Sequence, residues 1–196
     1  MKKILVPTVL QSSATELPYP DNYFDAIFTD PPYYDNVPYS YLSDFFYVWL
    51  KRSVGDLYPE LFSTPLTPKS KEIVAYSHIE GGYEAGKKFF EDMLKKAFQE
   101  IHRVLKPNGI VVIAYTHKST TGWETLINSL LDSGLVITAS WPIDTEMKAR
   151  LVAKDSAALA SSIYIVCRKL QREELGWFEE VKKEVIKEVE RTAEEV

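Results

Sequence analysis

The chain has 196 residues, of which 45% are hydrophobic and 26% are charged. These proportions are those of a globular domain and exclude a fully disordered chain. The formal net charge of −5 has the wrong sign for a protein that binds nucleic acid through overall charge alone, although it leaves room for local basic patches. The single cysteine excludes an internal disulfide and a cysteine-ligated zinc site, and the apolar runs are too short for a membrane span. We therefore expect a cytoplasmic protein without a metal site.

Hydrophobic periodicity predicts strands that alternate with helices along most of the chain. The expected strands are 4–10, 24–29, 110–115, 135–141 and 162–167. The expected helices are 39–52, 84–105, 121–133 and 170–195. An irregular segment, residues 53–82, separates the first two helices and has the length of a functional or mobile loop. This order predicts an α/β domain with a largely parallel sheet, in which sites lie at the carboxyl ends of strands.

A four-residue motif, Asp30-Pro31-Pro32-Tyr33, directly follows the predicted strand 24–29. It resembles the Asp-Pro-Pro-Tyr signature of amino-group methyltransferases that use S-adenosylmethionine. The resemblance implies that the Asp30 carboxylate and the Pro31 carbonyl accept the two hydrogens of an amino group, which aims the nitrogen lone pair at the methyl donor. Two successive prolines restrict the backbone and orient both acceptors in advance, and Tyr33 offers a flat face to a flipped-out base. The alternative is a simple turn in which Tyr33 belongs to the core.

The surrounding sequence extends this resemblance to most of the chain. Residues 11–26 are similar to the stretch before the motif in class I methyltransferases, and residues 103–109 are similar to the approach to their fifth strand. Residues 29–37 and 41–52 are similar to the large adenine-specific DNA methylases of archaea and bacteria that carry a zinc ribbon. The resemblance therefore implies a Rossmann-like class I methyltransferase fold.

The resemblance, which covers roughly residues 10–170, and the charged apolar-striped pattern after it together divide the chain into two expected parts. Residues 1–170 form a methyltransferase-like domain, and residues 171–196 form a charged amphipathic helix. The apolar stripe of that helix either docks on the domain or makes a dimer contact. The scattered basic residues between 51 and 118 either line a nucleic-acid face or form an ordinary solvated surface.

The resemblance implies N6-methylation of adenine in DNA, with S-adenosylmethionine as the cofactor. The residues expected to act on the amino group are Asp30, Pro31, Pro32 and Tyr33. Those expected near the cofactor are Ser13, Ala14, Thr29 and Asp30. Those expected to contact the substrate are Tyr33, Tyr34, Asn36, His117 and Lys118.

The chain lacks the glycine-rich loop with which class I methyltransferases hold their cofactor. It contains 8 glycines, and none of them forms that pattern. Only 29 residues precede Asp30, and apart from strand 24–29 they have room for one strand and a turn. We therefore expect an incomplete sheet without the first two strands of the fold, and an open edge beside strand 24–29. Three interpretations stay open. They are a DNA adenine methyltransferase or its catalytic-motif half, an RNA guanine methyltransferase with the same motif, and a non-catalytic fragment or subunit. In the last case a partner chain or a second copy completes the sheet.

Overall fold

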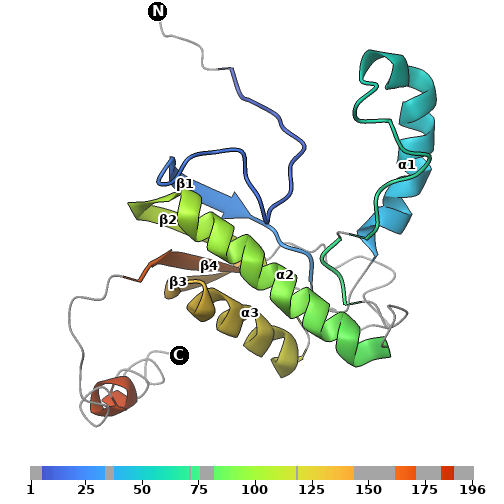
Figure 1. Ribbon diagram of the computed structural model, residues 1–196. Helices are drawn as coiled ribbons and strands as arrows, with labels where there is room; N and C mark the ends of the chain where they lie inside the picture. The colour runs from blue at the N-terminus through green and yellow to red at the C-terminus, as the bar shows by residue number, and fades with distance from the viewer. Residues whose placement is uncertain are drawn as a thin grey trace, which may run out of the picture.

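The structure, a computed structural model, describes residues 6–33, 38–70, 72–75, 82–117, 119–143, 162–170 and 182–187. Its four strands are β1 (Phe24–Thr29), β2 (Leu105–Tyr115), β3 (Leu135–Ile143) and β4 (Ser162–Lys169). Its helices are α1 (Tyr39–Val54), the short 3-10 helix η1 (Gly55–Leu57), α2 (Gly82–Val104) and α3 (Thr120–Asp132) (Figure 1). Residues 182–187 are also helical, whereas the rest of the predicted C-terminal helical part, 171–181 and 188–196, lies outside the described residues. Across the described ranges, no helix is long and apolar enough to cross a membrane.

The four strands form one sheet in the order β1-β2-β4-β3. β1 pairs with β2 in parallel, and β4 runs antiparallel between β2 and β3. β1, β2 and β3 therefore point the same way, and helices connect them as in a Rossmann-like fold. This confirms the predicted fold class. The expectation of largely parallel pairing is wrong, because β4 returns beside β3 and separates it from β2, so that only β1 and β2 form a parallel pair.

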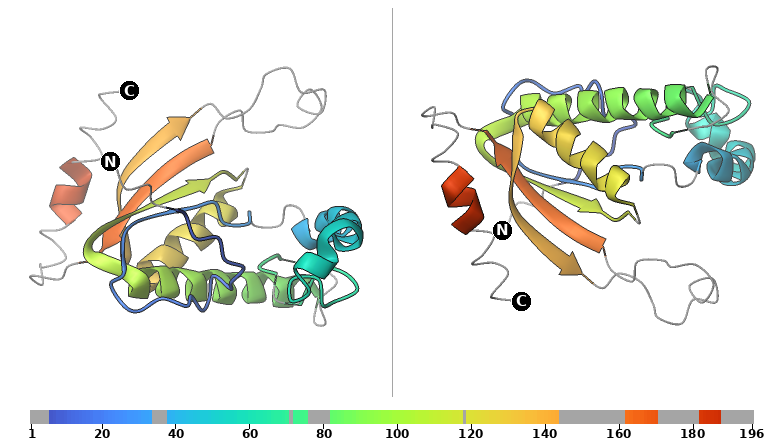
Figure 2. Two further views of the ribbon diagram at one scale, coloured as in Figure 1. Left: turned by 90° about the horizontal axis from the view of Figure 1, so that it is seen from above. Right: turned by 90° about the horizontal axis from the view of Figure 1, so that it is seen from below.

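α2 and α3 lie on the same face of the sheet and enclose the core with it (Figure 2). Because apolar residues recur at helical spacing in α2, they share the face that meets the sheet. The principal side chains of this core are Phe90, Leu94, Phe98, Ile101, Val111, Ile113, Tyr115, Leu126 and Leu130. Cys167 of β4 is buried among them, and burial raises the pKa of its thiol to about 11. A buried thiol with a raised pKa is little ionised near neutral pH, so Cys167 serves as a core residue.

The opposite face of the sheet is also apolar, but within the described residues much of it is exposed. Phe28 of β1 is 62% exposed and Trp141 of β3 is 61% exposed. Phe28 lies edge-on to the ring of Tyr164 on β4, with the ring centroids 5.6 Å apart. Since side chains alternate between the two faces of a strand, these rings lie opposite the α2 and α3 layer. The described part of the sheet is therefore covered on one side only.

β1 forms one edge of the sheet, and among the described residues its only strand partner is β2. This is the open edge that the sequence predicts beside strand 24–29. The predicted strand at 4–10 is wrong for the described residues 6–10, which form no strand. Val6 and Val9 are 84% and 91% exposed, so pairing there buries nothing, and Pro7 lacks the N–H that a strand ladder needs.

α1 projects away from the sheet instead of packing on it (Figure 1). The predicted helix at 39–52 is confirmed, with its end two residues further along at Val54. Residues 58–70 run back beside α1, and we call residues 39–70 the arm. Phe45 and Phe46, which contribute to the apolar periodicity of this helix, are 66% and 65% exposed. The periodicity therefore identifies the helix correctly but does not place its apolar side in the core.

Arg103, near the end of α2, ties the segment before β1 to this helix. Its guanidinium donates hydrogen bonds to the Asp21 carboxylate at 2.6 Å, the Glu100 carboxylate at 2.7 Å and the Tyr19 carbonyl at 2.9 Å. Glu100 also accepts a hydrogen bond of 2.7 Å from the backbone N–H of Leu17. The Glu100–Arg103 hydrogen bond raises the pKa of Arg103 and lowers the pKa of Glu100. These contacts set the position from which β1 starts.

Replacing Arg103 with alanine is expected to loosen this segment, because several acceptors lose one charged donor together. The expected result is several-fold faster cleavage after Tyr23, measured by mass spectrometry of limited chymotrypsin digests. Lys106→Ala is the control, because it removes only an exposed ion pair of 2.6 Å with Asp25. Equal acceleration in both variants would contradict the anchoring role of Arg103.

Candidate functional site

The Asp30-Pro31-Pro32-Tyr33 motif begins directly after β1, at the end of the sheet where β1 and β2 both finish. Thr29, the last residue of β1, is paired with β2, which fixes the point at which the motif starts. Pro31 is buried, Pro32 and Tyr33 are half-buried, and Asp30 is exposed. The backbone of the motif is thus held in the fold while its carboxylate is open to solvent. This is the location at which sites of α/β sheets occur.

Tyr33 turns back toward the sheet and contacts the carboxylate of its own motif. Its ring meets the ring of Tyr115 edge-on, with centroids 5.3 Å apart. Its hydroxyl donates a hydrogen bond to Asp30 and accepts one from Ser162. Burial, followed by the charge of Asp30, raises the pKa of Tyr33 to about 12. In this structure the Tyr33 hydroxyl is therefore a hydrogen-bond donor to the Asp30 carboxylate.

The pKa of Tyr33 gives a prediction that tests this contact. We expect Tyr33 to titrate near pH 12, against about 10 for an ordinary tyrosine. Because folding favours the neutral form, the resulting stabilisation is complete below about pH 10 and is lost as the pH rises to about 12. Asp30→Asn removes the charge, so the pKa of Tyr33 should fall while burial keeps it above the ordinary value. Tyrosine Cζ chemical shifts measure this, with Tyr33→Phe assigning the signal, and an unchanged pKa would contradict the contact.

A second carboxylate, that of Glu72, lies near the motif and binds the first turn of α1. It accepts a hydrogen bond of 2.8 Å from the backbone N–H of Ser40, and a second one from the Ser40 hydroxyl. Burial raises the pKa of Tyr39, and the charges of Asp30 and Glu72 raise it further. Tyr39 therefore lies within electrostatic reach of both carboxylates.

His117 follows β2, and the start of α3 holds its ring. Its Nδ1 accepts a hydrogen bond of 3.0 Å from the backbone N–H of Ser119, and the Trp123 indole N–H donates to the His117 carbonyl at 3.1 Å. The His117 ring stacks on Tyr115 with centroids 6.4 Å apart. Gly122 is required here, because a Cβ atom at this position would collide with the His117 ring. The ring of Tyr115 therefore links His117 to the motif.

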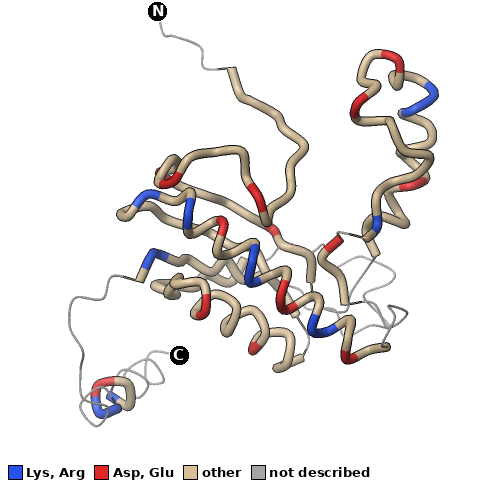
Figure 3. The backbone as a smooth tube through the Cα atoms, viewed as in Figure 1, with Lys and Arg blue, Asp and Glu red and all other residues tan. Residues whose placement is uncertain are grey.

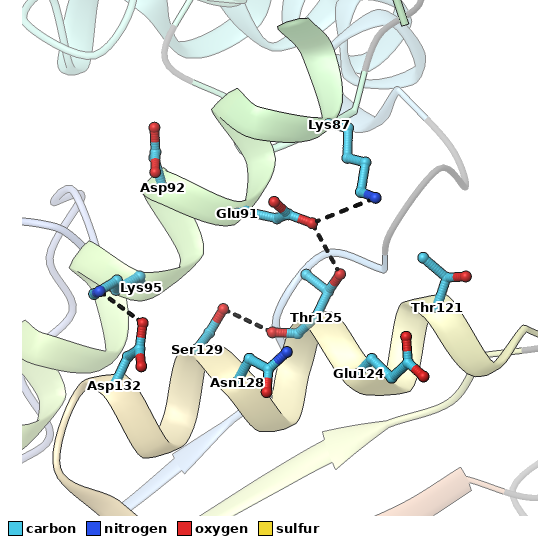
Figure 4. Close-up of a pocket in the computed structure, with 10 residues that line it drawn as sticks. All are labelled: Lys87, Glu91, Asp92, Lys95, Thr121, Glu124, Thr125, Asn128, Ser129 and Asp132. Carbon is cyan, nitrogen blue, oxygen red and sulfur yellow. Dashed lines mark hydrogen bonds and ion pairs between the residues drawn. The ribbon is translucent and has the colours of Figure 1, made fainter. Parts of the chain in front are cut away.

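A groove between α2 and α3 contains none of the motif residues (Figure 4). Some of its polar side chains pair with one another across the two helices. Lys95 and Asp132 form an ion pair of 2.7 Å, and the Thr125 hydroxyl donates to Glu91 at 3.2 Å. Because these groups already satisfy each other, the groove does not identify a ligand, and the candidate site remains at the ends of β1 and β2.

No family model and no curated protein matches the sequence. Among solved structures, TTHA0409 of Thermus thermophilus, a proposed DNA modification methylase, aligns with 87% of the chain at 16% identity and a TM-score of 0.42. The same protein complexed with S-adenosyl-L-methionine aligns with 87% at 15% identity and a TM-score of 0.44. The [4+2]-cyclase SpnF aligns with 81% at 16% identity and a TM-score of 0.37. The chain spans 56%, 59% and 55% of the lengths of these three structures, respectively.

The structure brings some of the predicted site residues together and places others elsewhere. Around the ends of β1 and β2 lie Thr29, Asp30, Pro31, Pro32, Tyr33 and His117. Ser13 and Ala14 are exposed, in a turn where the Ser13 carbonyl accepts a hydrogen bond of 3.2 Å from the N–H of Glu16. Their predicted role at a cofactor gains no support from a described contact with the motif. Outside the described residues lie Tyr34, Asn36 and Lys118.

Four residues of the site belong to no sequence motif that would identify them. They are Glu72, Tyr115, Trp123 and Ser162. Tyr115 has a positional signal, because it ends a predicted strand at the edge where sites occur. Ser162 begins a predicted strand, which becomes informative only when that strand is known to be antiparallel. Glu72 lies in the irregular segment and has no signal in the sequence.

Proposed function

We propose that this chain is the catalytic-motif half of a methyltransferase that modifies the N6 amino group of adenine in DNA. The observation that carries the proposal is the Asp30 carboxylate, which is exposed directly after β1 while Pro31 behind it is buried. A carboxylate in this position is open to an incoming group, and its backbone is fixed by the sheet. The resemblance of the motif to amino-group methyltransferases supplies the reaction class.

The chemistry assigned to this chain is the binding and orientation of the amino group. An exocyclic amino nitrogen is a poor nucleophile because its lone pair is delocalised into the base. Asp30 and the Pro31 carbonyl accept its two hydrogens and so favour a lone pair that points out of the base plane. The amino group replaces the Tyr33 hydroxyl as the hydrogen-bond partner of Asp30, and the freed Tyr33 ring stacks on the flipped base.

S-adenosylmethionine is the methyl donor that this proposal requires, and the described residues do not form a complete site for it. Ser13 and Ala14 are exposed, and no glycine-rich turn lies beside β1 in the described part of the chain. We therefore assign no step on this chain to the cofactor. Instead, we propose that a partner chain or a second copy pairs with the open edge of β1 and supplies most of the cofactor contacts.

DNA is proposed over RNA because residues 29–37 and 41–52 resemble adenine-specific DNA methylases. Guanine in RNA is the competing target, since the same motif serves that chemistry. A net charge of −5 does not attract either polymer, so affinity must come from the flipped base and from local contacts.

Recognition of the amino group can be tested without the cofactor. Fluorescence anisotropy compares a thymine strand carrying one adenine with the same strand carrying N6,N6-dimethyladenine, which has no amino hydrogens. We expect the wild-type chain to prefer adenine by about tenfold or more, because a hydrogen bond to a charged group contributes about 1.5–3 kcal/mol. Asp30→Asn should lose this preference, whereas Asp25→Asn, which changes an exposed carboxylate of β1, should keep it.

Equal affinity of the wild-type chain for the two strands would refute the proposed role of Asp30. A preference for guanine over N2,N2-dimethylguanine in RNA, without a preference for adenine, would favour the competing target. Calorimetric titration with S-adenosylmethionine then addresses the cofactor. Micromolar binding by this chain alone would mean that it forms the cofactor site itself or as a pair of copies, and no binding at millimolar cofactor would mean that a different partner chain supplies the missing contacts.

A further inference from the structure

α1 has two sides of opposite character, and its polar side is the one that is covered. Asp44, Tyr47 and Lys51 share this side, because they are spaced at helical intervals. The Asp44 carboxylate forms an ion pair of 2.8 Å with Lys69. The Tyr47 hydroxyl and the Lys51 ammonium both donate to the carbonyl of Thr64, at 2.8 and 2.6 Å. The returning part of the arm therefore packs on the polar side of the helix.

The other side of α1 carries an apolar stripe, which consists of Leu42, Phe45, Phe46, Trp49 and Leu50. Their exposed fractions are 59%, 66%, 65%, 58% and 50%, respectively. A surface helix usually buries such a stripe and exposes its polar side, and here the arrangement is reversed. A contiguous exposed apolar patch marks an interaction surface, so we expect another molecule to bind the stripe.

The size of the apolar stripe matches the requirement of a stable protein contact. A whole aromatic side chain offers about 150–250 Å², so three rings exposed by about three fifths present roughly 300–450 Å². With the two leucines, the stripe approaches the roughly 600 Å² per partner at the lower end of specific interfaces. A pair of such surfaces is therefore large enough to hold two chains together.

Charge indicates what kind of occupant fits. The arm contains three acidic residues, Asp44, Asp56 and Glu60, and three basic ones, Lys51, Arg52 and Lys69. Figure 3 shows these charges spread along an otherwise uncharged arm. A neutral apolar surface does not attract a polyanion, but it does not repel a copy of itself either. This favours a second copy of the chain over nucleic acid.

We propose that the apolar stripes of two copies pack against each other, with the two α1 helices antiparallel. A twofold axis lets one self-complementary patch serve both chains. Parallel helices would bring the Lys51 and Arg52 cations of both copies together at one end, whereas antiparallel helices separate them. Antiparallel packing also places opposite ends of the helix dipoles side by side. The inference does not depend on the proposed function.

Sedimentation velocity at micromolar concentrations tests this proposal. We expect the wild-type chain to have twice the 22.4 kDa chain mass. The double variant Phe45→Glu and Trp49→Glu should sediment as a monomer at the same concentration. A second double variant, Leu42→Lys and Phe46→Lys, should do the same. Leu131→Glu is the matched control, because this leucine is also 55% exposed but lies on α3, and it should leave the dimer intact.

Circular dichroism should show all these variants to be folded, since the stripe contributes no side chain to the core. A monomeric wild-type chain at high micromolar concentration would overturn the proposal. So would a dimer that survives both double variants. Ser53→Cys tests the orientation: antiparallel helices place the two thiols about 20 Å apart, and a rapid disulfide between copies would overturn the antiparallel arrangement.

Discussion

Replacing Asp30 with alanine is expected to lower methyl transfer at least a hundredfold and to leave the fold intact. Loss of one oriented acceptor at a reacting group costs about 10²–10³ in rate. The fold should survive because Asp30 is exposed, and its described hydrogen bond is to Tyr33 of the same motif. The measurement is transfer of a labelled methyl group from S-adenosylmethionine to adenine-containing DNA, in the preparation where the wild-type chain is active, with the partner if one is required.

Asp25→Ala is the matched control for this experiment. Asp25 is an exposed carboxylate on β1, and its ion pair with Lys106 is far from the carboxyl end of the strand. We expect it to retain wild-type transfer. Full activity of Asp30→Ala would exclude the catalytic role of the motif, and equal losses in the two variants would point to a general effect of charge on the strand.

Replacing Leu130 with alanine is expected to lower the free energy of unfolding by about 2–5 kcal/mol. Leu130 is fully buried on α3, where it contributes to the core under the sheet. The alanine leaves a cavity, and the loss is large against the roughly 5–15 kcal/mol that stabilises a typical domain. Urea unfolding followed by circular dichroism measures the change as a shift in midpoint at constant slope.

The adjacent Leu131 provides a control of the same residue type on the same helix. It is 55% exposed, so Leu131→Ala should change the free energy of unfolding by no more than about 0.5 kcal/mol. Comparable losses in the two variants would mean that the face of α3 assigned to the core is wrong.

Local patterns in the sequence predict where the helices and strands lie better than they predict which elements pair with one another. The strand at 24–29 and the motif after it are predicted because an apolar run meets two prolines, and both signals lie within ten residues. The antiparallel position of β4 cannot be predicted in this way, because it depends on pairing with β2 and β3 across long stretches of chain. The same reason explains why Ser162 is missed: its contact with Tyr33 exists only in the assembled sheet.

α1 shows a second limit of sequence patterns. Its periodicity predicts a helix with one apolar side, but a pattern does not say whether this side meets the chain's own core or a surface outside it. The return of residues 58–70 along the polar side decides the matter, and this depends on bonds such as the one between Lys51 and the Thr64 carbonyl. The candidate site follows the same rule. Its motif lies in one short segment and is predictable from the sequence, whereas its contacts with segments distant in the chain are not.

The parallel pairing of β1 with β2 also has a consequence for the order of folding. Phe28 pairs with Val112, and the whole arm and α2 lie between them in the chain. Closing so long a loop is entropically costly, so contacts of this kind form slowly. β2, α3, β3 and β4 follow one another in the chain, and β4 pairs with both β2 and β3, so these elements can assemble first. We therefore expect β1 to join a nucleus that has already formed, although β1 is synthesised earlier than the elements of that nucleus. The Asp30 motif should then acquire its geometry only at the end of folding.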